Sequence, residues 1–163
     1  MSNISIVTGD IFKTDRQMIA VPVNLKGTMG AGLAKAAKQK FPNLLEVYQD
    51  ACRHSEIDVY RPVLVSNEEW EYDDGYRMIC LFATKDDWRN DSELDYIREG
   101  LKWLRYHYDL AGVKSMALPS LGCGLGGLNF DDVLALIKEI LGGIDIPVDV
   151  YRPMGGRNEY KKN

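Results

Sequence analysis

The chain has 163 residues, of which 45% are hydrophobic and 27% charged, and its formal net charge at pH 7 is −4. This length and composition are ordinary for one soluble globular domain with a sizeable core. The negative charge argues against broad binding of nucleic acid through a basic surface, because neutralising phosphates requires clustered lysine and arginine.

The cysteines and histidines indicate neither a disulfide framework nor a metal site. Cys52, Cys80 and Cys123 are odd in number and form no CxxC pair. His54 and His107 have no metal-ligand spacing to each other or to a cysteine pair. We also find no signal peptide and no apolar run long enough to span a bilayer. The sequence therefore predicts a reducing, cytoplasmic location, no membrane association and no bound metal.

Short apolar runs alternate along the chain with segments of helical periodicity. The predicted strands cover residues 4–8, 18–23, 59–65, 76–82, 114–118 and 146–151, with an acidic turn region at 68–75. The predicted helices cover residues 30–41, 44–53, 91–108 and 129–141. This alternation predicts an α/β sandwich with a mainly parallel or mixed sheet. We expect residues 154–163, which hold two glycines and several charges, to form a flexible tail.

Two glycine-rich segments, 27–32 and 122–127, each lie between a predicted strand and the following predicted helix. Glycine lets the backbone approach a ligand closely, and a helix N-terminus presents unpaired N–H groups and partial positive charge. The two loops are therefore expected to face one another and hold two phosphates of a dinucleotide-like anion. The alternative interpretation is that both are simply tight turns.

Established nucleotide-binding motifs match these loops only in part. Gly122, Gly124 and Gly127 form a GxGxxG pattern between a strand and a helix. A Rossmann oxidoreductase carries that pattern in its first βα unit, whereas here little chain follows it, which disfavours hydride transfer. The first loop lacks the Gly-Lys-Ser/Thr ending of a P-loop, so the lysine and hydroxyl that bind a nucleoside triphosphate and magnesium are missing.

Three side chains near the glycine loops or the strand ends are candidates for chemistry, and each also has a plainer explanation. Cys123 lies between two glycines, but neither histidine lies in an obvious active loop, so packing is favoured over nucleophilic attack. Lys85 follows a predicted strand, at the edge where α/β sheets bind ligands, although position alone favours a solvated lysine. Asp10 can accept hydrogen bonds from an exocyclic amine, or it can cap a turn.

Four segments follow one another in a familiar order. They read VTGDI at 7–11, VN at 23–24, MGAGLA at 29–34 and LPSLGCGL at 118–125. Together they resemble the macrodomain family, in the branch with terminal ADP-ribose protein glycohydrolase, DNA ADP-ribosyl glycohydrolase antitoxins and ADP-ribose-1″-phosphate phosphatases. The resemblance implies a three-layer α/β/α sandwich with a central mixed sheet over residues 1–153, and binding of ADP-ribose without a cofactor.

The resemblance also implies roles for individual residues. Asp10 would contact the adenine amino group with the Ile11 backbone beside it, and Asn24 would approach the distal ribose. Tyr151 would border the adenine pocket. The two phosphate-binding loops would comprise Met29, Gly30, Ala31 and Gly32, and Ser120, Leu121, Gly122, Cys123, Gly124, Leu125 and Gly126.

Lys85 gains a role from the same resemblance. Thr84-Lys85 matches the position of a catalytic lysine in the glycohydrolases of this branch. An amine can attack the anomeric carbon of an ADP-ribosyl linkage and form a covalent adduct, provided that burial or a cationic neighbour lowers its pKa.

One departure from the family pattern concerns the general acid. The protein glycohydrolase has an acid directly after Gly-Cys-Gly-Leu, where this chain has Gly126. Asp131 or Asp132 can lie nearby, although the charge of a helix N-terminus is their default explanation. Gly126-Gly127 favours ADP-ribosylated nucleobases over protein glutamate esters, because the antitoxin-like members carry the same pair.

The predicted function is that of a hydrolase that uses Lys85 to remove ADP-ribose from a modified nucleobase or protein. Two alternatives stay open: hydrolysis of ADP-ribose-1″-phosphate, and binding of ADP-ribose or a nucleotide signal without catalysis. The expected partners are ADP-ribose and ADP-ribosylated nucleic acid or protein, and the chain is expected to be a monomer. Its domain economy suggests a bacterial or phage protein that counters ADP-ribosylation.

Overall fold

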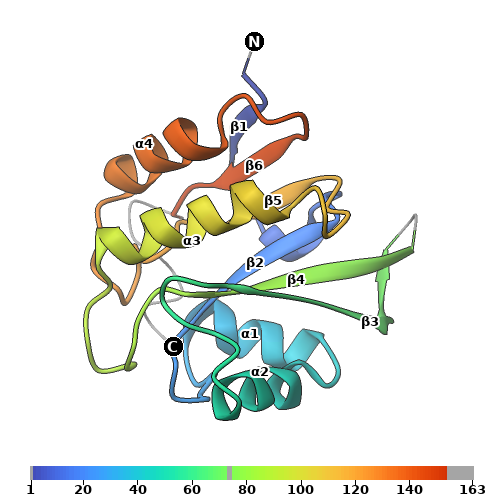
Figure 1. The fold of residues 1–163 in the computed structure, drawn as a ribbon, viewed down its shortest axis with the longest axis vertical. Helices are drawn as coiled ribbons and strands as arrows, with labels where there is room; N and C mark the ends of the chain where they lie inside the picture. Colours follow the sequence, from blue (N-terminus) through green and yellow to red (C-terminus); the bar gives the residue numbers. More distant parts are fainter. Residues whose placement is uncertain (1, 73–74, 154–163) are drawn as a thin grey trace.

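A computed structural model of the protein describes residues 2–72 and 75–153, and Figure 1 shows its fold. The strands are β1 (Ile4–Val7), β2 (Met18–Val23), β3 (Val63–Tyr72), β4 (Gly75–Ala83), β5 (Met116–Leu118) and β6 (Val148–Tyr151). The α-helices are α1 (Gly32–Lys40), α2 (Leu44–Arg53), α3 (Leu94–His107) and α4 (Phe130–Leu141), and a short 3-10 helix, η1, covers Ile11–Lys13. The expected tail, 154–163, lies outside the described residues.

The strands form one mixed sheet in the order β1-β6-β5-β2-β4-β3. Neighbouring strands are parallel except for the antiparallel pair β3 and β4. In the centre, Ala20 of β2 pairs with Cys80 of β4, and Met18 pairs with Met116 of β5. Because β2, β4 and β5 are parallel, their carboxyl ends meet at one edge of the sheet, where the loops that follow them come together.

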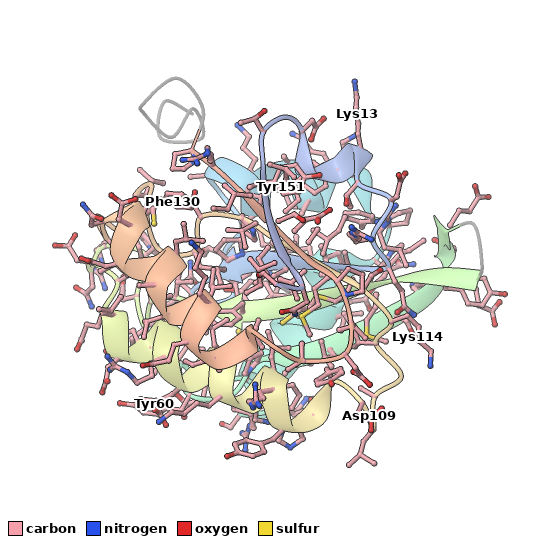
Figure 2. All side chains as sticks on the ribbon, turned by 90° about the horizontal axis from the view of Figure 1, so that it is seen from above. Lys13, Tyr60, Asp109, Lys114, Phe130 and Tyr151 are labelled. Atoms are coloured by element: carbon pink, nitrogen blue, oxygen red, sulfur yellow. The ribbon has the colours of Figure 1, made fainter. Side chains whose placement is uncertain are left out.

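Side chains of the central strands alternate between two hydrophobic layers. Ala20 and Phe82 pack with α3 and α4, whereas Ile19, Val21 and Leu81 pack with α1 and α2. Figure 2 shows α4, which begins at Phe130, running alongside α3. Each helix pair therefore covers one face, and the predicted three-layer α/β/α sandwich is confirmed. No helix of the described chain is both long and apolar enough to cross a membrane.

Helix α3 lies very close to β4. A Cβ at Gly100 would collide with the ring of Phe82, so glycine at this position allows the helix backbone to approach the strand. Ile97 and Leu104 of the same helix are fully buried. This packing holds the two ends of the segment 84–93, which connects β4 to α3, in fixed positions.

The predicted strand 59–65 and the predicted turn at 68–75 are wrong in their boundaries. The strand starts at Val63 and continues through the acidic segment to Tyr72. Buried Trp70 alternates there with exposed Glu69 and Glu71, and its Nε1 donates a hydrogen bond of 2.8 Å to the Pro42 carbonyl. One face of the acidic segment is thus anchored to the turn between α1 and α2, and the acidic side chains occupy the solvated face of a strand.

Candidate functional site

A cavity of about 530 Å³ lies at the carboxyl ends of β2, β4 and β5. Its walls combine the end of β2 at Val23 and Asn24, the segment that follows β4, and both glycine loops. This volume is within the range of sites for small molecules and cofactors. The position is also the one at which parallel α/β sheets usually bind ligands. The two glycine loops therefore line one cavity, as the sequence predicts.

The first glycine loop is held in shape by Asn24. The Asn24 Nδ2 donates to the backbone oxygen of Thr28 at 3.2 Å and to Thr28 Oγ1 at 2.9 Å. Its Oδ1 accepts from the Lys26 N–H at 2.8 Å and from the Tyr48 hydroxyl at 2.7 Å. The Asn24 side chain thus forms its hydrogen bonds with the protein, mostly with the loop. Thr28 lines the cavity, and because its Oγ1 accepts from Asn24, its hydroxyl proton can be donated to a ligand. The expected contact between Asn24 and a ribose stays a prediction.

The N-terminus of α1 points its backbone donors at the cavity. Residues 30–34 line the cavity, and Gly32 adopts the left-handed φ of +59° that lets the chain turn into the helix. Within the described chain, no side chain caps this helix and its first turn holds no acidic residue. The N–H groups of the first helical turn have no partner within a helix, and the helix dipole favours negative charge there. This end of α1 is suited to bind a phosphate.

The second glycine loop offers backbone donors of a different origin. Among the described residues, the N–H groups of Gly124, Leu125 and Gly126 have no hydrogen-bond acceptor, and all three residues line the cavity. The helix that follows does not contribute, because Asn129 Oδ1 already accepts from the first N–H groups of α4. Both loops precede a helix, as predicted, but only the first is followed by a helix whose first N–H groups have no side-chain cap.

The amine of Lys85 reaches across to the second glycine loop. Its Nζ donates to the Leu125 carbonyl oxygen at 3.2 Å and approaches the Trp88 carbonyl oxygen at 3.5 Å. Partial burial lowers the pKa of Lys85 from its ordinary value, and the carboxylate of Asp91 opposes that shift. A lysine held at a cavity wall with a lowered pKa has more of the neutral amine that nucleophilic attack requires.

Gly126 occupies a position in which a side chain does not fit. A Cβ there would collide with the Ser92 Oγ and with the carbonyl oxygen of Gly122. The Ser92 backbone N–H also donates to the Gly126 carbonyl at 3.0 Å, which ties the loop to the segment before α3. The acid that the protein glycohydrolase carries at this point is therefore excluded here by packing. Asp131 and Asp132 lie in the first turn of α4, where they match its dipole.

The segment after β4 also contributes Trp88, which the sequence analysis did not single out. Trp88 lines the cavity although 59% of its surface is exposed. The guanidinium of the neighbouring Arg89 makes two hydrogen bonds to Asp87, of 3.0 and 2.6 Å, and holds the pKa of that carboxyl well below its usual range. The sequence feature that could have indicated Trp88 is its position, three residues after the candidate lysine.

Six of the predicted ligand-binding residues do not line this cavity. Tyr151, labelled in Figure 2, ends the strand that pairs with β1, and Asp10 follows β1, so these two lie on adjacent strand ends. The Asp10 carboxylate accepts from the Phe12 N–H at 3.0 Å, which is the turn-capping alternative. Of the other four, three are buried and Cys123 is partly buried; the three are Ile11, Met29 and Leu121. Their expected contacts with ADP-ribose remain predictions.

Cys123 has the environment of a packing residue. Burial raises the pKa of its thiol to about 12, and its Sγ lies 3.5 Å from the Leu121 carbonyl oxygen. A thiol that stays protonated is a poor nucleophile. Among the described residues, no three His, Cys, Asp or Glu side chains are grouped so that they can hold a metal ion.

Comparison with known proteins identifies the fold and its family. The profile of the macro domain matches residues 21–137. The chain belongs to the macro domain family. This macro domain is 39% identical over 167 residues to a DNA ADP-ribosyl transferase–DNA ADP-ribosyl glycohydrolase fusion protein of Thermosipho africanus. It is 32% identical over 154 residues to the DNA ADP-ribosyl glycohydrolase of Mycobacterium tuberculosis.

These matches cover most of the macro domain but less than half of each relative. They span 95% and 94% of this chain, and 43% of the length of each relative. Among solved structures, Thermosipho africanus DarTG in complex with ADP-ribose superposes with a TM-score of 0.87 at 36% identity, covering 99% of this chain and 46% of that one. The macro domain therefore corresponds to one part of a longer architecture in these relatives.

Proposed function

We propose that this macro domain is an ADP-ribosyl glycohydrolase that releases ADP-ribose from a modified base of DNA. The observation that carries the proposal is the amine of Lys85, held 3.2 Å from the Leu125 carbonyl oxygen at the wall of a cavity lined by both glycine loops. Two relatives that match almost the whole chain are named for DNA ADP-ribosyl glycohydrolase activity, and a similar structure holds ADP-ribose.

The cavity supplies the contacts that a pyrophosphate needs. The N-terminus of α1 offers the backbone donors of Gly32, Leu33 and Ala34, and the second loop offers those of Gly124 to Gly126. Placing the pyrophosphate between these donors would bring the distal ribose towards Lys85. We place the adenine near the adjacent strand ends that carry Asp10 and Tyr151.

The chemistry we propose has two steps. The lone pair of the neutral Lys85 amine forms a bond to the anomeric carbon of the distal ribose, the bond from that carbon to the base breaks, and its electron pair leaves with the base. The proton lost by the amine is transferred to the base, through solvent or a nearby acid. Water then hydrolyses the ribosyl–lysine adduct, which frees ADP-ribose and restores the amine.

The surroundings of Lys85 disfavour the two alternative activities. The exposed carboxylate of Asp91 acts on the amine, so an anionic phosphomonoester, as in ADP-ribose-1″-phosphate, would meet negative charge there. A module that only binds ADP-ribose has no need of an amine with a lowered pKa at its cavity wall. Lys85 is thus the feature that separates a hydrolase from a reader.

A panel of substrates tests the proposal. Wild type and Lys85→Ala are compared on an ADP-ribosylated single-stranded DNA oligonucleotide, a peptide ADP-ribosylated on a carboxylate, and ADP-ribose-1″-phosphate. We expect wild type to release ADP-ribose from the oligonucleotide and Lys85→Ala to lose this turnover while still binding ADP-ribose. Equal turnover by the two proteins would remove Lys85 from the mechanism, and preference for either of the other substrates would overturn the assigned target.

A further inference from the structure

We infer that Trp88 and Leu125 form a clamp for the nucleobase that the enzyme cleaves from ADP-ribose. This inference rests on the proposed function, because it names the residues that hold the leaving base beside Lys85. Trp88 and Leu125 are large apolar side chains that remain exposed, by 59% and 47%, and both line the cavity. Other large exposed apolar side chains of the described chain, such as Tyr76 and Tyr106, do not line it.

The clamp is built around the reacting amine. The Lys85 Nζ lies 3.2 Å from the carbonyl oxygen of Leu125 and 3.5 Å from that of Trp88. The two residues with exposed apolar side chains are therefore also the two whose backbones hold the amine. Any group attached to the anomeric carbon under attack must lie within a few ångströms of them. An apolar pair at this point favours a flat, uncharged leaving group over a carboxylate or a phosphate.

The backbone that carries Trp88 is fixed on both sides. The Asp87 carboxylate is largely buried and accepts from the backbone N–H of Arg89 at 2.9 Å as well as from its guanidinium. The loop is joined to the segment between β2 and the first glycine loop by the bond from the Leu25 N–H to the Asp86 carbonyl at 3.0 Å. Trp88 is thus exposed on a well-anchored turn, which is the arrangement expected of a binding platform rather than of a stray surface residue.

Arg89 adds a cationic group to the same platform. Its guanidinium carbon lies 5.6 Å from the centroid of the Trp88 ring, and its side chain is 69% exposed. Aromatic rings flanked by arginine are typical platforms for unstacked bases of single-stranded nucleic acid, with the cation near the backbone phosphates. The chain as a whole carries a net charge of −4, so such binding has to be local rather than spread over a basic surface.

Substrate affinity in an inactive background tests the clamp separately from catalysis. In Lys85→Ala, we measure dissociation constants for an ADP-ribosylated single-stranded oligonucleotide and for free ADP-ribose, with and without Trp88→Ala. We expect Trp88→Ala to weaken binding of the oligonucleotide about tenfold more than binding of free ADP-ribose, which is the effect of losing one base–aromatic stack. Trp88→Phe should retain most of the affinity because it keeps a flat ring.

Matched controls make each outcome informative. Tyr106→Ala removes an aromatic ring that is 75% exposed on α3, outside the cavity, and should change neither affinity. The inference is overturned if Trp88→Ala weakens ADP-ribose equally, if it leaves the oligonucleotide unaffected, or if it weakens an ADP-ribosylated peptide to the same extent. Failure of the proposed function would show differently, as a wild-type protein that releases no ADP-ribose from the oligonucleotide.

Discussion

The Nζ of Lys85 donates a hydrogen bond of 3.2 Å to the carbonyl oxygen of Leu125, forty residues further along the chain. This contact joins the segment after β4 to the second glycine loop. The amine is therefore positioned by the same loop whose N–H groups face the cavity. In the proposed reaction, one short stretch of backbone would therefore both bind phosphate and position the nucleophile.

Lys85→Arg separates the charge of this residue from its nucleophilicity. Arginine keeps a positive charge and can donate to the Leu125 carbonyl, but it does not lose its proton in proteins. We expect this variant to bind ADP-ribose within a few-fold of wild type and to release no ADP-ribose from the modified oligonucleotide at any pH. Calorimetric titration measures the affinity for ADP-ribose, and an ADP-ribose release assay measures turnover. Turnover by the arginine variant would show that only the charge matters.

The pH dependence of turnover should reflect the environment of Lys85. Its pKa lies below that of an ordinary lysine because of partial burial. Since the neutral amine is the reactive form in the proposed mechanism, kcat/KM should rise with pH. The pH range of this rising limb should lie below the usual pKa range of lysine. The opposing carboxylate of Asp91 raises this pKa, so Asp91→Asn should move the limb to still lower pH and increase the rate on its acidic side.

The Asp91 variant also tests an alternative role for that carboxylate. If Asp91 supplied the proton to the leaving base, Asp91→Asn would lower the rate even on the acidic side of the limb, where the electrostatic effect alone raises it. Added salt provides a second check, because screening should reduce the difference between wild type and variant when the effect is purely electrostatic.

Gly126→Asp should not create a protein-ester hydrolase. The new Cβ would collide with the Ser92 Oγ and the Gly122 carbonyl oxygen, so the loop must move to accommodate any side chain. We expect a loss of about 1–3 kcal/mol of stability, the usual cost of overpacking, together with weaker binding of ADP-ribose. Thermal unfolding and calorimetry measure both.

Gly30→Ala is the matched control for this substitution. A Cβ at Gly30 meets no atom within 4 Å, so the melting temperature of the Gly30→Ala protein should equal that of wild type. A stable Gly126→Asp protein with activity on a peptide ester would show that the loop accepts an acid after all, contrary to the packing around Ser92.

The sequence predicts the layers of this fold because periodicity and burial agree along most of the chain. The alternation of Ile19, Ala20 and Val21 between the two cores is visible as an unbroken apolar run. The prediction fails at 68–75, where five acidic residues hide the pattern of a strand. Trp70 is buried there against α1 and α2, and local composition does not reveal a contact with a segment so distant in sequence.

The parts of the candidate site formed by the glycine loops could be predicted from the sequence. The contacts between side chains that are distant in sequence could not. Gly30, Gly32, Gly122 and Gly124 all line the cavity, as expected from the loops. The environment of Gly126 depends on Ser92, which the chain brings in from the segment before α3. Trp88 enters the site through a turn fixed by Asp87 and Arg89, and no spacing rule indicates that turn.

Cys123→Ser should leave turnover unchanged. The residue is partly buried, and burial raises the pKa of its thiol to about 12, so little thiolate exists near neutral pH. Serine has nearly the same size and preserves the turn in which the Cys123 N–H donates to the Ser120 carbonyl at 3.0 Å. The measurement is the release assay, with labelling by a thiol reagent as a second readout. Slow labelling of Cys123 is expected. Loss of activity in the serine variant would restore the nucleophile hypothesis.

Tyr48→Phe should weaken ADP-ribose binding from outside the cavity. The buried hydroxyl of Tyr48 lies 2.7 Å from both the Asn24 carbonyl oxygen and Asn24 Oδ1, and Asn24 in turn holds Thr28 at the cavity wall. Removing the hydroxyl leaves buried acceptors without their donor, which costs about 1–3 kcal/mol of stability and loosens the first loop. Chemical denaturation and calorimetry measure the two effects. Tyr106→Phe alters only an exposed hydroxyl and serves as control; a Tyr48→Phe protein that loses stability but keeps full affinity would show that Asn24 orders the core and not the binding loop.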